Sequence, residues 1–156
     1  MSQPHPKKMS LKIIPAETTD IERLVVFMRD FYEHEALQFD EPAARRALQQ
    51  LIGNPFFGRI FLLEFAGKKV GYTVLTFGYS LEFHGRDAFV DELYIVASHR
   101  GRGFGKRTLD CLADVCRSEG IAALHLEVER ANTIAQEVYR KQGFKDHDRY
   151  LLTKWI

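Results

Sequence analysis

The sequence predicts a protein of the α/β (α+β) class, built on a mixed, mostly antiparallel sheet of seven strands. Two observations support this class. Segments rich in β-branched and aromatic residues alternate with amphipathic helical segments in the order β-α-α-β-β-β-α-β-α-β-β. Short turns make most neighbouring strands antiparallel, whereas one strand–helix–strand unit at residues 88–128 requires a parallel pair.

The first half of the chain supplies a strand, two helices and a hairpin. Apolar residues recur at helical spacing over Ile21–Tyr32, and Thr18 or Thr19 can cap this helix. Asp40 can cap a second helix that has Pro42 at its first position. The expected elements are a strand at Leu11–Pro15, the first helix, a helix at Glu41–Leu51, and strands at Arg59–Phe65 and Val70–Tyr79 joined by a turn.

The second half begins with a reversal at Glu82–Arg86, which leads into a central strand at residues 88–96. This strand is apolar on both faces except for two adjacent acids, Asp91 and Glu92. A helix follows and is stopped by Gly120. The remaining expected elements are a strand at Ala122–Val128, a helix at Asn132–Gln142, and closing strands at Gly143–Asp146 and Arg149–Trp155.

Length and composition indicate one domain with a cytoplasmic setting. The chain has 156 residues, of which 46% are hydrophobic, and shows no internal repeat or linker. We therefore expect a single domain at residues 11–156 after a flexible leader at residues 1–10. Cys111 and Cys116 lie five apart in the expected helix and project in different directions, so a disulfide between them is not expected.

The charge balance argues against nucleic acid and membrane partners. Lys plus Arg number 22 and Asp plus Glu number 21, which leaves a net charge of +1. No apolar run approaches the roughly 20 residues that a membrane span needs. The histidines have no metal-ligand spacing, so we expect no metal site.

A glycine-rich basic turn follows the central strand and is typical of an anion site. Its glycines are Gly101, Gly103 and Gly105, and its basic residues are Arg100, Arg102, Lys106 and Arg107. Glycine permits positive φ and close backbone approach. The amides left unpaired at the start of the following helix favour an anion. The turn therefore predicts a seat for a phosphate or pyrophosphate.

Two motifs resemble those of the GCN5-related N-acetyltransferase (GNAT) superfamily. Residues 100–105 (RGRGFG) resemble motif A, Arg/Gln-x-x-Gly-x-Gly/Ala, and residues 129–145 resemble motif B through Asn132, Tyr139 and the closing Gly143-Phe144. Within the superfamily, residues 31–35 (FYEHE), 91–96 (DELYIV) and 137–144 (EVYRKQGF) look most like the diamine and polyamine acetyltransferase branch. The resemblance implies helices on both faces of the sheet and a splayed central strand pair.

The resemblance also implies acetyl-CoA as co-substrate, with its pantetheine arm in the gap between the splayed strands. The implied binding residues are Leu93, Tyr94 and Ile95 for the pantetheine, Arg100, Gly101, Arg102, Gly103, Phe104, Gly105 and Lys106 for the pyrophosphate, and Asn132 and Ala135 for the CoA arm. Tyr139 takes the position of the general acid. Asp91 and Glu92 are both candidates for the base, and alternation along a strand lets only one face the acceptor unless a bulge intervenes.

We expect the acceptor to be the primary amine of a small, cationic molecule, such as a diamine, polyamine, basic amino acid or amino sugar. Its expected binding residues are Tyr32, Glu33, Glu35, Glu82 and Asp91. The resemblance further suggests a homodimer. Two other functions stay open: acetylation of a protein N-terminus or lysine, and non-catalytic sensing of acyl-CoA.

Each candidate residue also has a purely structural interpretation. Glu33 and Glu35 could belong to a solvated helix face, and Glu92 could form an ion pair with an arginine. Tyr139 could be a packing residue. Its place seven residues after Asn132 and before Gly143-Phe144 favours the catalytic interpretation.

Overall fold

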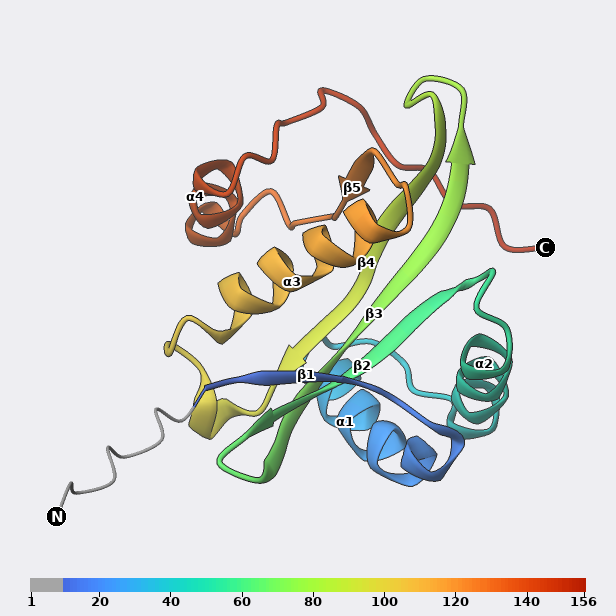
Figure 1. The fold of residues 1–156 in the computed structure, drawn as a ribbon, viewed down its shortest axis with the longest axis vertical. Coiled ribbons are helices and arrows are strands. Elements are labelled where there is room, and N and C mark those ends of the chain that lie inside the picture. Colours follow the sequence, from blue (N-terminus) through green and yellow to red (C-terminus); the bar gives the residue numbers. More distant parts are fainter. Residues whose placement is uncertain (1–9) are drawn as a thin grey trace, which may run out of the picture. The chain divides into compact units, whose positions relative to one another are not determined.

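The computed structural model describes residues 10–156 (Figure 1). Contacts divide the chain into two compact units, one ending at Leu126 and the other formed by Glu127–Ile156. The single domain expected at residues 11–156 stays a prediction. The expected leader at residues 1–10 lies, except for its last residue, outside the described residues.

The first unit is built on a five-stranded sheet with the strand order β1-β2-β3-β4-β5. Neighbouring strands are antiparallel except β4 and β5, which are parallel as the sequence predicted. The strands are β1 (Lys12–Pro15), β2 (Gly58–Phe65), β3 (Lys68–Ser80), β4 (Gly85–Ile95) and β5 (Ala123–His125), and the helices are α1 (Ile21–His34), α2 (Glu41–Gly53) and α3 (Phe104–Ser118).

Helices cover both faces of this sheet, as expected. Leu62 of β2 packs in one core cluster with Leu24 of α1 and Leu48 of α2. Its neighbour Leu63 packs in another cluster with Phe104, the first residue of α3. Successive side chains of a strand point to opposite faces, so the two clusters lie on opposite sides of the sheet.

A bulge in β4 determines the direction of its acids. Glu92 lies opposite Val74 of β3 and Val90 lies opposite Leu75, so Asp91 has no partner in this register. Val74 belongs to the core under α1 and α2. Glu92 therefore shares that face, whereas Val90 points to the opposite face with Leu75.

The two parallel strands pair over only three residues and then part. The pairing runs from Asp87 opposite Ala123 to Phe89 opposite His125, which makes β5 shorter than the expected strand at Ala122–Val128. Beyond Phe89, β4 continues to Ile95 without β5 at its side. This parting agrees with the splayed pair that the family resemblance implied.

The second unit contains one helix, α4 (Thr133–Lys141), and no strand. The closing strands expected at Gly143–Asp146 and Arg149–Trp155 are therefore wrong, and the sheet has five strands instead of seven. A strand requires a ladder of backbone bonds to a neighbour. Here the bonds are local: the Arg140 guanidinium binds the Asp146 carboxylate at 2.8 Å, and the Arg149 N–H donates to the His147 carbonyl.

The helix starts agree with the sequence only in part. The Asp40 carboxylate caps α2 by accepting a backbone N–H at 3.0 Å, as predicted, but Pro42 is the second helical residue and not the first. Neither Thr18 nor Thr19 caps α1, because both belong to a 3₁₀ turn that ends at Asp20. The extra turn displaces the start of α1 beyond both threonines.

A substitution at Gly71 tests the close approach of β3 to the end of β4. A Cβ added at Gly71 would lie 2.0 Å from the Tyr94 carbonyl oxygen. We expect Gly71→Ala to lower the free energy of unfolding by about 1–3 kcal/mol in urea denaturation. Gly53→Ala in α2 is the control, because no atom lies within 4 Å of its added Cβ and alanine favours helix. Equal stability of the two variants would contradict this register.

Candidate active site

The deeply buried acid of β4 is held by a tyrosine. Glu92 is 9% exposed, and its carboxylate accepts a 2.6 Å hydrogen bond from the Tyr72 hydroxyl of β3. A buried carboxylate requires such donors. Among the described residues, no arginine forms an ion pair with Glu92. The structural interpretation as an arginine ion pair therefore does not apply.

The surroundings of Glu92 act on its pKa in opposite directions. Burial has the largest effect and raises the pKa. Hydrogen bonds from Tyr72 and Tyr32 lower it, and the negative charge of Asp91 raises it. A general base is most effective when its pKa lies near the working pH. A buried carboxylate with a raised pKa is suited to that task.

Asp91 and Tyr32 lie close to Glu92. Burial raises the pKa of the Tyr32 phenol on α1, and the charges of Glu92 and Asp91 raise it further. Burial also raises the pKa of Asp91, although that residue keeps an exposed surface. Alternation in a regular strand would direct the two acids to opposite faces. The bulge instead lets both act on the tyrosines of one face.

A cavity of about 280 Å³ lies beside the end of β4. Its lining comes from the end of α1, from β4 and from the turn that follows β4, namely Phe31, His34, Glu35, Leu93, Tyr94, Ile95 and Arg100. The Arg100 guanidinium donates to the Ile95 carbonyl at 2.8 Å and lies 5.6 Å from the centre of the Tyr94 ring. β5 does not pair with this part of β4, and an unpaired strand edge can bind an extended ligand through its backbone groups.

The glycine turn before α3 fits a pyrophosphate. Gly101 and Gly103 have φ values of 73° and 75°, which favour glycine. Gly103 is the N-cap residue of α3, no side chain caps this helix, and its first turn contains no acid. No atom lies within 4 Å of a Cβ added at Gly101, Gly103 or Gly105. The helix start is therefore open to an anion.

The other residues of this turn differ in what they can offer a ligand. Phe104 is only 5% exposed and packs in the core, so its backbone is the part that can bind. The Arg102 guanidinium lies over the Phe65 ring at 5.9 Å, and the Lys106 ammonium pairs with Asp110 at 2.8 Å. A bound phosphate would compete with Asp110 for Lys106.

The second unit carries the expected acid and two residues expected to contact CoA. Asn132 caps α4, because its side-chain oxygen accepts from the Ala135 N–H at 3.1 Å. The Tyr139 ring meets the Phe144 ring edge-on, with 6.0 Å between the ring centres. Burial raises the pKa of the Tyr139 phenol. This phenol therefore keeps its proton at neutral pH, as a general acid must.

The structure separates some of the residues expected to bind the acceptor. Glu82 lies in the turn between β3 and β4, about 20 Å along the strand from Glu92 at the usual rise per residue. Glu33 is exposed on α1. Glu35 lines the cavity with Leu93–Ile95 and Arg100, which are residues expected to bind acetyl-CoA. Of the five, Tyr32 and Asp91 lie close to Glu92.

Tyr72 was not among the residues expected at the site. Its signal in the sequence is a tyrosine inside the expected strand at Val70–Tyr79, where a buried phenol needs a hydrogen-bond partner. The identity of that partner depends on the register, which places Tyr72 opposite Tyr94 and two residue pairs from Glu92, on the same face of the sheet.

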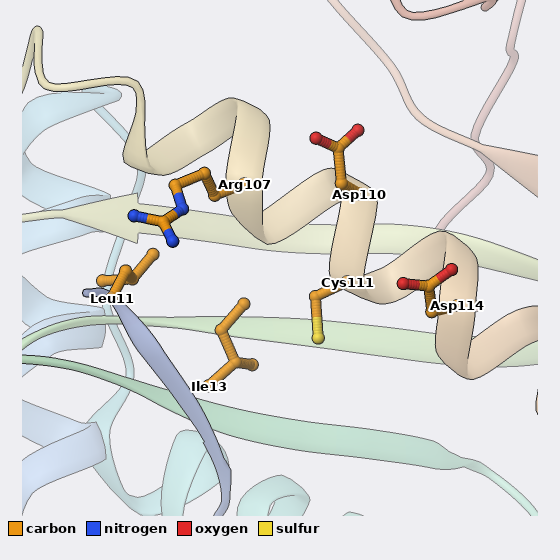
Figure 2. A pocket seen from close by; sticks show the side chains of 6 residues that line it. All are labelled: Leu11, Ile13, Arg107, Asp110, Cys111 and Asp114. Carbon is orange, nitrogen blue, oxygen red and sulfur yellow. The ribbon is translucent and has the colours of Figure 1, made fainter. Parts of the chain in front are cut away.

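A second cavity, of about 330 Å³, lies between α3 and the start of β1, and Figure 2 shows the side chains that line it. Its lining consists of Leu11, Ile13, Arg107, Asp110, Cys111 and Asp114, none of which was expected at the site. Burial raises the pKa of the Cys111 thiol, and the charge of Asp114 raises it further. A protonated thiol is a poor nucleophile, so this cavity does not show the chemistry of an active site.

Residues 10–156 contain neither a metal-binding cluster nor a membrane-spanning helix. No group of three or more His, Cys, Asp or Glu side chains there is placed to hold a metal ion. None of the described helices is both long and apolar enough to cross a membrane.

The splayed strands and the uncapped glycine turn are typical of N-acetyltransferases that use acetyl-CoA. Residues 24–144 match the acetyltransferase (GNAT) family, and the chain belongs to this family. It is an acetyl-CoA-dependent enzyme that transfers an acetyl group to an amine. The similarity to this family inferred from the two sequence motifs is confirmed.

Relatives and solved structures agree with this family. A thialysine N-ε-acetyltransferase of Sus scrofa is 27% identical over 146 residues, which cover 88% of this chain and 85% of the relative. An integron cassette protein from the mobile metagenome of Cole Harbour Salt Marsh is 33% identical, with a TM-score of 0.82 and coverage of 92% and 90%. A predicted acetyltransferase of Clostridium acetobutylicum, solved with acetyl-CoA, is 19% identical, with a TM-score of 0.78, and the match covers 93% of this chain and 96% of that protein. At this identity the similarity supports the fold only.

The two ends of α3 offer a matched test of the anion seat. Gly103 and Gly120 have φ values of 75° and 69°, and neither has an atom within 4 Å of an added Cβ. We expect Gly103→Ala and Gly120→Ala each to lower the free energy of unfolding by about 1–2 kcal/mol. We expect only Gly103→Ala to weaken acetyl-CoA binding in calorimetry, by about tenfold or more (about 1.4 kcal/mol). Unchanged affinity in Gly103→Ala would contradict the anion seat.

Proposed function

We propose that the enzyme transfers the acetyl group directly from acetyl-CoA to the primary amine of a small cationic acceptor. The observation that carries this proposal is the position of two adjacent acids, Asp91 and Glu92, at the bulge beside the unpaired edge of β4. The Sus scrofa relative, named for thialysine, supports an amine of a small molecule as acceptor.

The charges near the bulge favour a cation. Asp91 and Glu92 are adjacent acids on one strand, and both act on the phenol of Tyr32. Asp30 on α1 adds a third carboxylate, whose charge contributes to the raised pKa of Tyr94 behind the effect of burial. Negative charges gathered in this way attract an ammonium group. A diamine, polyamine, basic amino acid or amino sugar carries such a group beside the amine that reacts.

Glu92 is the base and Asp91 holds the cation in this proposal. An aliphatic amine is protonated at neutral pH, because its ammonium form has a pKa of about 10. It must lose a proton before its nitrogen can attack. Glu92 is buried and held by Tyr72, which suits a base that takes this proton directly or through one water. Asp91 keeps an exposed surface, which suits an ion pair with a second ammonium group.

The remaining roles follow the family motifs. Backbone groups of Leu93–Ile95 bind the pantetheine and polarise the thioester carbonyl. Residues 100–106 bind the pyrophosphate, and the side-chain amide of Asn132 keeps donors for the CoA arm while its oxygen caps α4. Glu92 takes the proton of the ammonium group and releases it to water, and the neutral amine then attacks the thioester carbonyl to form the C–N bond. As the C–S bond breaks, a second proton leaves the attacking nitrogen and restores the Tyr139 phenol through water. The leaving thiolate takes its proton from Tyr139.

A panel of acceptors tests the proposed substrate class. We expect free CoA to be released with diamines, polyamines, basic amino acids or aminoglycosides, and far more slowly with neutral amines. We expect Asp91→Asn to raise the KM of a diamine about tenfold or more, because one charge-assisted hydrogen bond is lost, and to leave the KM of a matched monoamine nearly unchanged. Turnover confined to neutral amines or to peptide N-termini would overturn the cationic acceptor.

Tyr139→Phe tests the proposed acid. We expect kcat to fall by about 10²–10⁴, the usual contribution of general acid–base catalysis, with little change in the Kd of acetyl-CoA. Tyr150→Phe is the control in the same unit, because that tyrosine is 81% exposed. If Tyr139→Phe kept the wild-type kcat, Tyr139 would be a packing residue.

A further inference from the structure

We infer that Tyr72 is a positioning residue for acetyl transfer, because its phenol holds the Glu92 carboxylate in place for the acceptor amine. This inference rests on the proposed role of Glu92 as the base. Tyr72 belongs to neither sequence motif and does not reach the surface. Its effect on the reaction therefore passes through Glu92.

The hydrogen bond between these two residues has a fixed geometry. The Tyr72 hydroxyl donates to Glu92 Oε2 at 2.6 Å, the length of a strong bond to a charged acceptor. The Tyr72 ring lies parallel to the Phe27 ring, with 2° between the planes and 6.2 Å between the centres, and the Tyr94 ring lies 6.3 Å away. The ring is fully buried among these neighbours, so close packing restricts the positions that its hydroxyl can take. The orientation of the carboxylate is fixed as a result.

The Glu92 carboxylate keeps hydrogen-bonding sites for the acceptor. An ionised carboxyl group has two oxygens with about four lone-pair sites in total. Tyr72 takes one site on Oε2, and Tyr32 acts on the same carboxylate from α1. The two phenols leave sites for the amine or for a bridging water.

The two phenols that bind Glu92 also affect its pKa. Tyr72 faces it from β3, Tyr32 from α1, and Asp91 from its own strand. Burial and the charge of Asp91 raise the pKa of Glu92, and none of these three neighbours is a cation that would lower it. The hydrogen bonds of Tyr72 and Tyr32 supply that lowering. They help to keep Glu92 ionised, and able to accept a proton, at neutral pH.

Tyr72→Phe is the central variant of the test. It removes a bond to the charged form of Glu92, so the pKa of Glu92 rises and the base is protonated at a higher pH. We expect the acidic limb of the kcat/KM profile to move upward by roughly one to two pH units with the preferred acceptor. We expect the Kd of acetyl-CoA to stay within about twofold. The same acceptor is used throughout, so its own titration cancels between variants.

Thr73→Val is the matched control. The Thr73 hydroxyl is also fully buried and donates at 2.9 Å to Glu92, but to the backbone carbonyl and not to the carboxylate. Its loss removes one buried hydrogen bond from the same residue. We expect a lower melting temperature and no movement of the acidic limb. Equal movement of the limb in both variants would show a general structural effect and overturn the positioning role.

A direct titration separates this inference from the proposed function. In protein labelled with ¹³C at the glutamate carboxyl carbons, the Glu92 signal is the one absent from Glu92→Gln. We expect its pKa to rise in Tyr72→Phe and to stay at the wild-type value in Thr73→Val. An unchanged value in Tyr72→Phe would overturn the inference whether or not any amine is acetylated. Absence of turnover on every amine would instead overturn the proposed function.

A second variant covers the case in which Tyr72→Phe does not fold. Tyr32 is half-buried on α1, so Tyr32→Phe removes the other phenol from a less enclosed position. We expect the acidic limb and the Glu92 titration to move upward here too, by less than in Tyr72→Phe. If the titration moved and the limb did not, Glu92 would be held by the phenols without acting as the base, and the positioning role would fall.

Discussion

The bulge at Asp91 is the constraint on which the candidate site depends. A regular β4 would place Val90 and Glu92 on the same face, because side chains alternate along a strand. One extra residue instead turns Glu92 toward the face covered by α1 and α2, where Tyr72 and Tyr32 reach its carboxylate. The parallel pairing with β5 ends at Phe89, two residues before the bulge. The turned acids and the open strand edge therefore lie at the same place along β4.

The chain has a net charge of only +1, so the attraction of charged ligands depends on local groups of charged residues. The acids at residues 91 and 92 precede the open edge of β4, and the basic glycine turn follows it. In the proposed reaction, the cationic acceptor and the anionic co-substrate therefore bind at separate places on one continuous stretch of chain. The basic side chains of the turn have partners other than the acids of β4. Lys106 pairs with Asp110, and Arg100 donates to a backbone carbonyl, so neither neutralises Glu92. Opposite charges attract their ligands most effectively when they do not first pair with each other.

Features that depend on local signals were predicted well, and features that depend on register were not. The order of the first five strands, the cap at Asp40 and the glycine turn follow from neighbouring residues. The closing strands did not form, because a strand also needs a partner and the residues after α4 bond locally through Arg140 and Asp146. The sequence marked Asp91 and Glu92 as acids but could not show the bulge, which is a property of the pairing between β3 and β4. Tyr72 was missed for the same reason: its hydroxyl meets Glu92 only in that register.

A crystal structure with CoA and a diamine tests the central claim most directly. The decisive measurement is the distance from the primary amine to the Glu92 carboxylate. We predict that the pantetheine lies along the edge of β4 at Leu93–Ile95. The amine should then lie about 3 Å from Glu92 or be joined to it by one water. A diamine bound beside Glu82, or in the cavity of Arg107 and Asp114, with Glu92 still enclosed by its tyrosines, would contradict the account.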